Sequence, residues 1–315
     1  MADQADRLRA LRLVRGSADG TKASRSWGAS FGRRVVRSIA VVSGKGGVGK
    51  TAVASNLALA LRRRGQRVLL VDADLALSNV DLVHGLTPKF TLGDVVLGHV
   101  PIEEVVLTTS DGVRILPASS GVEEIADLDD FRRETLLRQL TRLEDNLDVI
   151  VIDVGSGIGR QAMHFARAAG QALVVTTPEP TAFADAYAVI KLLSARRRTA
   201  PQSLGLVVNM ARSPREGRET ARRIRAVAAR FLGLEPVCFG VVPYDDAVAR
   251  SVRRQELLLR LFPHSPAATS VDLLAARLLV EIPEPEPESI APDLLDGDTF
   301  ESRGFFQKVA GGGQR

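Results

Sequence analysis

The chain has 315 residues, of which 45% are apolar, so it can form one large α/β domain with extensions or two small domains. It contains no run of about 18 apolar residues, so no transmembrane helix is predicted. Its single cysteine, Cys238, excludes a disulfide framework and a cysteine-ligated metal site within one chain, which fits a reducing cytosol and leaves open only a cluster shared by two copies. The net charge of +5 is unevenly spread, because residues 1–38 carry nine Lys or Arg against three Asp, whereas residues 281–301 carry eight Asp or Glu and no Lys or Arg.

Four segments follow one another along the chain. Residues 1–35 are interpreted as an N-terminal extension, rich in Ser, Gly and Arg in its second half. Residues 36–280 form the predicted core. Residues 281–299 form an acidic, Pro-rich linker, because residues 283–288 repeat Pro-Glu three times. Residues 300–315 form a short tail.

Within the core, apolar runs rich in β-branched residues alternate with stretches of helical periodicity. The predicted strands are Ile39–Ser43, Val68–Asp72, Val113–Pro117, Val149–Asp153, Ala172–Thr176, Leu204–Asn209 and Val237–Val242. The predicted helices are Lys50–Arg64, Phe131–Asn146, Gly159–Gly170, Ala182–Arg198 and Arg215–Leu232. This alternation predicts an α/β fold with a doubly wound, mostly parallel sheet and helices on both faces, in which ligands bind at the carboxyl ends of the strands.

A glycine-rich loop lies between the first predicted strand and the first predicted helix, which is the context that a P-loop requires. Its glycines let the backbone approach phosphate oxygens, and its N–H groups and the helix N-terminus surround the negative charge. Lys50 is expected to reach the β- and γ-phosphates of ATP, and the Thr51 hydroxyl is expected to bind Mg²⁺. The predicted nucleotide-binding residues here are Gly44, Lys45, Gly46, Gly47, Val48, Gly49, Lys50, Thr51 and Ala52.

Lys45 is an addition to the plain P-loop. A second lysine early in this loop is difficult to explain by packing, whereas a cation there can reach phosphate in its own subunit or in a facing one. The alternative is a solvated loop lysine.

Acidic residues follow two of the predicted strands. Asp153 ends an apolar strand, where a carboxylate near the P-loop can hold Mg²⁺ through its water shell. The loop Gly155–Gly157 follows and suits a mobile segment whose backbone N–H senses the γ-phosphate. Asp72 and Asp74 end another strand, where they can orient a lysine and a water molecule; the alternative is a pair of ordinary turn acids.

Together these residues resemble the MinD/ParA family of deviant Walker ATPases, over roughly residues 36–280. Lys45 matches the lysine that marks the family, and Asp72–Leu75 matches its first switch. Asp153–Ile158 matches its Walker B motif and second switch. Val242–Val248 is similar to the late motif beside the nucleotide base.

Within that family the chain most resembles the flagellar-number regulators, the FlhG or FleN group. Asp3–Arg9 matches the DQAxxLR element of that group, and Asp72–Asp81 reads DADLALSNVD where the group has DADLGLANVD. The chain departs from the pattern at Ala76, where glycine is usual, and at Val154 and Ser156 in a segment that usually reads DTGAGI. These are small changes that cast little doubt on the prediction of a nucleotide site, and they are expected to affect switch rates.

The resemblance implies an ATP-dependent homodimer in which slow, Mg²⁺-dependent hydrolysis of ATP acts as a timer. Lys45 would reach the phosphates of the partner subunit, Asp74 would position the attacking water, and Asp153 would support Mg²⁺. Asn209 and Pro243 would lie beside the adenine. The catalytic residues so implied are Lys45, Lys50 and Asp74, the metal-site residues are Thr51 and Asp153, and the switch residues are Asp72 and Gly155.

The resemblance also implies a set of partners. The N-terminal element would stimulate FlhF, a GTPase of the signal-recognition type, and flagellar switch components or a transcription regulator are further candidates. The alternative for this element is a frayed terminus. The protein is expected in the cytoplasm, attached peripherally to the inner face of the membrane when ATP is bound. The residues implied in partner activation are Asp3, Gln4, Ala5, Leu8 and Arg9.

The tail has an amphipathic pattern, because Phe305, Phe306 and Val309 fall on one side of a helical wheel and Lys308 on the other. This resembles the membrane-targeting helix of the family, and a reversible contact with lipid is predicted. Its few cations make the attraction to anionic lipid modest. The alternative is an inert or core-docked tail.

An arginine stripe marks the helix predicted at 215–232, with Arg215, Arg218, Arg222 and Arg225 on one face. The opposite face, with Ile224, Val227 and Phe231, is expected to point to the core. A solvated helix face is the favoured interpretation. The alternative is contact with phosphate backbone, as in ParA-like DNA-partitioning ATPases that bind non-specific DNA.

Overall fold

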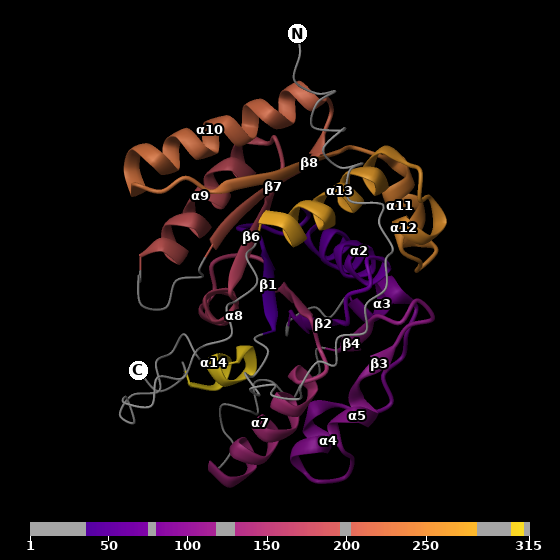
Figure 1. Ribbon diagram of the computed structural model, residues 1–315. Coiled ribbons are helices and arrows are strands. Elements are labelled where there is room, and N and C mark those ends of the chain that lie inside the picture. The colour runs from indigo at the N-terminus through magenta and orange to yellow at the C-terminus, as the bar shows by residue number, and fades with distance from the viewer. Residues whose placement is uncertain (1–35, 75–79, 118–129, 196–202, 282–303, 312–315) are drawn as a thin grey trace, which may run out of the picture. The chain divides into compact units, whose positions relative to one another are not determined.

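The computed structural model describes residues 36–74, 80–117, 130–195, 203–281 and 304–311. Its strands form an eight-stranded sheet in the order β3-β4-β2-β5-β1-β6-β7-β8. Every pairing is parallel except that of β3 with β4. The strands are β1 (Arg37–Val42), β2 (Val68–Ala73), β3 (Leu107–Thr108), β4 (Arg114–Leu116), β5 (Val149–Val154), β6 (Gln171–Thr176), β7 (Ser203–Ala211) and β8 (Val237–Pro243). The predicted doubly wound, mostly parallel sheet is confirmed (Figure 1).

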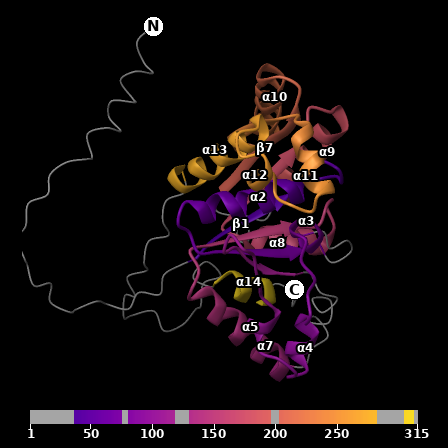
Figure 2. The same cartoon turned by 90° about the vertical axis from the view of Figure 1, so that its right-hand side faces the viewer.

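Helices cover both faces of this sheet (Figures 1 and 2). One face packs mainly against α7–α10, and the other against α2 and α13. The helices are α2 (Lys50–Arg63), α3 (Val80–His84), α4 (Leu92–Val96), α5 (Ile102–Val105), α7 (Asp130–Glu144), α8 (Arg160–Ala168), α9 (Pro180–Ser194), α10 (Pro214–Leu232), α11 (Asp246–Arg253), α12 (Leu258–Leu261), α13 (Pro266–Glu281) and α14 (Phe305–Gly311).

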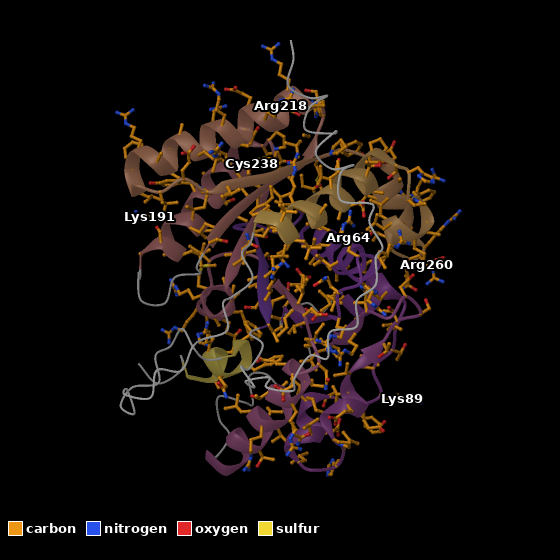
Figure 3. The ribbon with its side chains drawn as sticks, viewed as in Figure 1. Arg64, Lys89, Lys191, Arg218, Cys238 and Arg260 are labelled. Carbon is orange, nitrogen blue, oxygen red and sulfur yellow. The ribbon has the colours of Figure 1, made fainter. Side chains whose placement is uncertain are left out.

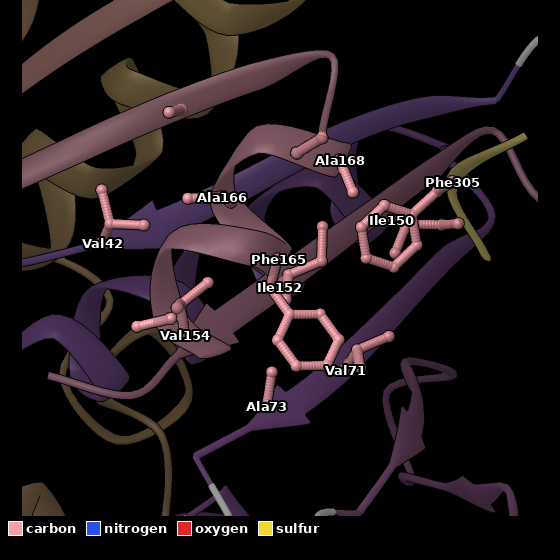
Figure 4. Packing of buried hydrophobic residues seen from close by; sticks show 14 of the residues in the cluster. Val42, Val71, Ala73, Ile150, Ile152, Val154, Phe165, Ala166, Ala168 and Phe305 are labelled. Carbon is pink, nitrogen blue, oxygen red and sulfur yellow. The ribbon is translucent and has the colours of Figure 1, made fainter. Parts of the chain in front are cut away.

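The central strands are almost entirely apolar, as expected where helices cover both faces of a sheet. All six residues of β2, β5 and β6 are buried. In β1 the side chains alternate, so that Ala40 and Val42 join the core on the α8 side while Ile39 and Val41 join the core on the α2 side. Figure 4 shows part of the first core, with the ring of Phe165 among strand residues of β2 and β5. Two apolar layers therefore hold the central strands in place.

One long helix, α13, was not predicted from the sequence. It packs against α2 and β8. Its signals are a proline at the first helical position and apolar residues at helical spacing. The buried residues of this spacing are Ala267, Ala268, Val271, Leu274, Ala275 and Leu278. The short elements β3, α3, α4, α5, α11 and α12 were not predicted either, since helices of four to eight residues and a strand of two residues show little periodicity.

The helix α10 corrects part of the arginine-stripe interpretation. Ser213 caps it by accepting from Glu216 N at 3.2 Å, and Gly233 ends it with φ of 65°. Its buried face contains Ile224 as predicted, but Phe231 is 64% exposed, so the prediction that it faces the core was wrong. Phe231 lies in the last turn of the helix, three residues after the last buried position, Ala228, and its ring contacts the guanidinium of Arg230.

Cys238 lies in the edge strand β8, as predicted, but it is half-buried and not fully buried (Figure 3). The edge position accounts for this, because β8 pairs with a neighbour, β7, on one side only. The predicted extension and nearly all of the predicted linker lie outside the described residues, so the division of the chain into four segments stays a prediction.

Candidate active site

The glycine-rich loop occupies the carboxyl end of β1 and leads directly into α2. Gly47 and Gly49 have φ of 79° and 82°, a left-handed conformation that favours glycine. A Cβ on Gly44 would collide with the backbone of Asp185 in α9, so the loop begins in direct contact with that helix. The loop thus takes the strand-to-helix form that surrounds phosphate with backbone N–H groups.

Ser43, which was not among the predicted site residues, forms hydrogen bonds that fix the start of the glycine-rich loop. Its hydroxyl donates to the carbonyl of Lys45 at 3.0 Å, and its own carbonyl accepts from Gly157 N at 2.9 Å. The second bond ties the loop after β5 to the P-loop. The start of the P-loop and the loop Gly155–Gly157 are therefore joined by a backbone hydrogen bond.

Lys50 and Asp153 form a buried ion pair across the site. The Lys50 ammonium donates to Asp153 Oδ1 at 2.6 Å, and the two side chains are only 7% and 1% exposed. Burial raises the pKa of the Asp153 carboxyl, and the Lys50 ammonium and the Thr51 hydroxyl oppose this by stabilising the carboxylate. The predicted phosphate-binding lysine and both predicted Mg²⁺-site residues therefore lie together.

Asp72 and Asp74 lie next to this pair. The Asp72 carboxylate is buried and accepts from Asp74 N at 3.0 Å and from Val80 N at 3.4 Å, so it holds both ends of the segment that contains residues 75–79. Asp74 faces the other switch, because a Cβ on Gly155 would lie 3.5 Å from Asp74 Oδ1. The two predicted switch residues and the predicted water-orienting carboxylate are thus neighbours.

Lys45 has two partners that the sequence analysis did not foresee. Its ammonium donates to Glu179 Oε2 at 2.8 Å and to Thr181 Oγ1 at 3.2 Å. The pair is accessible to water, with 34% of the Lys45 side chain and 64% of the Glu179 side chain exposed. Lys45 therefore points away from Lys50 and toward the start of α9 in this structure.

The residues predicted to lie beside the base, Asn209 and Pro243, are at the ends of β7 and β8. Asn209 is buried and donates from Nδ2 to the carbonyl of Val48 at 2.8 Å, which leaves one amide N–H and the amide oxygen for other partners. Met210 has φ of 56°, a rare conformation for a residue with a side chain, at an irregularity in the β7–β8 register. Pro243 ends β8 opposite Ala211.

These residues fit Mg²⁺-ATP by their chemistry. The glycines form a backbone cradle next to a helix N-terminus, which suits phosphate. Thr51 and Asp153 supply hydroxyl and carboxylate oxygens, the donors that Mg²⁺ prefers. The remaining amide groups of Asn209 match the donor and acceptor pair on the edge of adenine.

The tail residues are far from this site and docked into the core. Phe305 and Phe306 of α14 are 4% and 6% exposed and pack with α7 and α8. The buried carboxylate of Glu144 accepts from Phe306 N at 2.9 Å, and His164 Nε2 bonds to the carbonyl of Val309 at 2.5 Å. In this state the apolar face of the tail is not available to lipid, which matches the core-docked alternative.

The N-terminal element, with Asp3, Gln4, Ala5, Leu8 and Arg9, lies outside the described residues. Among the helices that the structure describes, none combines the length and the hydropathy that crossing a membrane requires.

Comparisons with known proteins agree with this geometry. The ParA family, described as NUBPL iron-transfer P-loop NTPase, matches residues 34–279. The antiactivator FleN of Pseudomonas aeruginosa is 44% identical over 243 residues, which make up 77% of this chain and 86% of FleN. The flagellum site-determining protein YlxH of Helicobacter pylori is 32% identical over 245 residues, 78% of this chain and 82% of YlxH.

A solved structure with a bound nucleotide is also similar. The septum site-determining protein MinD of Pyrococcus horikoshii, complexed with Mg-ADP, is 27% identical with a TM-score of 0.61 and is matched over 78% of this chain and 96% of its own. Because the family match and both bacterial relatives extend over most of the chain, this protein belongs to the ParA/MinD family of P-loop ATPases.

Proposed function

We propose that this MinD-like ATPase dimerises on ATP and regulates the number or placement of flagella. The observation that carries the proposal is the pair of lysines in one P-loop, Lys45 and Lys50, in a chain 44% identical to an antiactivator named FleN. The similarity to the flagellum site-determining protein YlxH supports the same role.

The nucleotide site acts by positioning and by neutralising charge, with no covalent step. Lys50 leaves its ion pair with Asp153 and binds the β- and γ-phosphates, while Thr51 and Asp153 support Mg²⁺. Bound Mg²⁺ supplies charge neutralisation on the phosphates. Asp74 orients the attacking water, and the Gly155 N–H senses whether the γ-phosphate is present.

Lys45 joins two subunits in this proposal. Its contacts with Glu179 and Thr181 are accessible to water, and an exposed ion pair is worth only about 0–1 kcal/mol. Lys45 therefore can exchange these partners for the phosphates of a facing subunit at little cost. Two copies would then enclose two ATP molecules, and hydrolysis would release them.

The N-terminal element is proposed to stimulate an FlhF-type GTPase. Its match to the DQAxxLR pattern supports this, and the basic charge of residues 1–38 suits an acidic partner surface. Deletion of residues 1–15 tests the role. Loss of stimulated GTP hydrolysis by FlhF, with unchanged ATP binding by this protein, is expected; equal stimulation by the truncated chain would show that the element has another role. Flagellar switch components or a transcription regulator remain further proposed partners.

The tail is proposed to contact the inner face of the membrane after leaving its slot on α7 and α8. The amphipathic pattern of Phe305, Phe306 and Val309 supports lipid contact. α8 supports a link to the nucleotide, because it begins directly after the loop Gly155–Gly157 and also carries His164, which holds the end of the tail.

A vesicle experiment tests the tail. Gly304→Ala introduces a Cβ that displaces the Glu144 carboxylate from its bond to Phe306 N, so this variant is expected to weaken docking of the tail and to bind anionic phospholipid vesicles without ATP. Gly240→Ala, where a Cβ meets open space, is the matched control. Co-sedimentation that persists after deletion of residues 300–315 would assign lipid binding to another surface.

DNA binding by α10 is not favoured. Arg222 pairs with Glu219 at 2.8 Å and Arg225 pairs with Glu235 at 2.7 Å, so half of the predicted stripe is already matched by carboxylates. A mobility-shift assay with the ATP-bound Asp74→Ala protein tests this. Salt-dependent binding of non-specific DNA in this assay, together with a failure of the same protein to recover FlhF in a pull-down, would favour a partitioning role.

A further inference from the structure

Ser156 lies between Gly155 and Gly157, in the loop that the proposed site places at the γ-phosphate end of ATP. It lies in the loop between β5 and α8. The residue before it, Gly155, faces the carboxylate of Asp74. The residue after it, Gly157, has φ of 94° and donates to the carbonyl of Ser43. The backbone on both sides of Ser156 is therefore fixed to the site.

The hydroxyl of Ser156 points to the P-loop. A Cβ built on Gly46 would lie 3.8 Å from Ser156 Oγ, and among the described residues other than Gly46 and its two chain neighbours no further heavy atom lies within 4 Å of that position. Gly46 adjoins Lys45 in the early part of the loop. A hydroxyl here faces the space that the loop glycines keep free of side chains.

Structural reasons do not account for this serine. Ser156 is exposed, and its hydroxyl forms no hydrogen bond within the part of the chain that the structure describes. Removing it should therefore cost the fold little. The family segment usually has alanine at this position, so the hydroxyl is a chemical addition made by this chain. An unused donor at an anion site is suited to a phosphate oxygen, because hydrogen bonds to charged groups are the stronger ones.

We propose that the Ser156 hydroxyl donates a hydrogen bond to the γ-phosphate of ATP and so makes this protein discriminate ATP from ADP. Ser156 is a positioning residue for the established ATPase reaction, and this assignment rests on the nucleotide site proposed above. The bond ties the second switch to the γ-phosphate by a side chain in addition to the Gly155 backbone. ADP lacks the acceptor and leaves the loop bound only through Gly157.

Equilibrium binding to the full chain tests the proposal. Dissociation constants for ATPγS and ADP, both with Mg²⁺, are measured at a protein concentration where light scattering shows a monomer. Ser156→Ala is expected to weaken ATPγS binding about tenfold, the loss of one hydrogen bond to a charged group, and to leave ADP binding unchanged. Ser156→Thr keeps the hydroxyl and is expected to restore ATPγS binding. Ser270→Ala removes a half-buried hydroxyl of α13 that donates to the Pro266 carbonyl, and it should change neither constant.

The outcomes separate this inference from the proposed site. Equal affinities of wild type and Ser156→Ala for ATPγS would overturn the assignment of Ser156 while leaving the P-loop site intact. A parallel loss for ATPγS and ADP would also overturn it, since it would mean that the hydroxyl supports the loop and not the γ-phosphate. Failure of the wild-type chain to bind either nucleotide would overturn both proposals.

Discussion

Lys50 and Asp153 depend on each other because water reaches neither charge. Their side chains are 7% and 1% exposed, and 2.6 Å separates the charged atoms. A buried ion pair adds little net stability, but a single buried charge without its partner is costly. The ion pair therefore holds Lys50, the proposed phosphate-binding lysine, in a low-energy position.

The Asp153→Ala substitution should expose this dependence. It leaves the Lys50 ammonium buried without a partner, so the free energy of unfolding is expected to fall by about 3–5 kcal/mol. Urea denaturation without nucleotide measures it. The double variant Lys50→Met, Asp153→Leu should recover most of the loss. Additive losses in the double variant would contradict the paired description.

Gly49 and Gly65 allow a matched test of the P-loop backbone. Both have φ of 82°, so alanine at either position costs about 1–2 kcal/mol of backbone strain. A Cβ on Gly49 also collides with the Asn209 amide, whereas a Cβ on Gly65 meets nothing within 4 Å. We expect Gly49→Ala to abolish binding of fluorescent ADP and Gly65→Ala to preserve it, with both variants less stable in urea. Retained binding by Gly49→Ala would exclude a role of the Asn209 contact.

At the scale of elements, Asp245 joins the loop after β8 to α11 and α13. Its carboxylate accepts from Ala247 N at 2.9 Å, which caps α11, and from Ala267 N at 3.1 Å in the first turn of α13. Burial acts to raise the pKa of Asp245, but the backbone N–H groups of Ala267 and Ala247 outweigh it and lower that pKa below its ordinary value. Two helices that follow β8, α11 and α13, are thus oriented by one charge.

This lowered pKa predicts a pH dependence. A carboxyl with a lower pKa in the folded state stabilises the fold above its unfolded pKa of about 3.9 and loses this contribution as the pH falls through the folded value. Asn has one acceptor oxygen where Asp245 uses two, so the stability gap between wild type and Asp245→Asn should be about 1 kcal/mol at pH 7 and shrink toward pH 3. Urea titrations across this range measure it, with the exposed neighbour substitution Asp246→Asn as control. A gap independent of pH would show that the charge of Asp245 is not involved.

At the scale of the whole molecule, the loop after β5 and the helix α8 form one continuous segment whose two ends contact different parts of the protein. The loop after β5 contacts the P-loop through Gly157, and α8, which follows it, contacts the docked tail through His164. In the proposed function, nucleotide and tail would therefore act on the same continuous segment, and a dimer would add a second subunit at the nucleotide end.

Lys45 tests the dimer directly. Lys45→Ala is expected to leave the chain folded and monomeric, and to abolish the doubling of mass that ATPγS with Mg²⁺ produces in multi-angle light scattering. Lys89→Ala, which removes another exposed lysine, is the control and should dimerise normally. A dimer that persists in Lys45→Ala would mean that the subunits associate without this cation.

The sequence by itself determined the sheet class, the P-loop, and the presence of Asp72, Asp74 and Asp153 at strand ends, because these depend on local periodicity and on the order of residues along short segments. Most predicted strands lie within a few residues of the observed ones. α13 carried a readable periodicity that was missed, and Phe231 was misplaced because helical spacing alone does not say where a helix extends beyond its sheet.

Only the tertiary structure decided which partners these side chains have. Lys45 meets Glu179 across 134 positions, Asn209 meets Val48 across 161, and Glu144 meets Phe306 across 162. Such pairs arise because the strand order places distant segments side by side, and no local pattern encodes that order. The amphipathic sequence of the tail suits a lipid surface and a protein surface equally well. In this structure the tail is docked because α7 and α8 offer apolar side chains, the Glu144 carboxylate that bonds to Phe306 N and the His164 imidazole that bonds to the Val309 carbonyl.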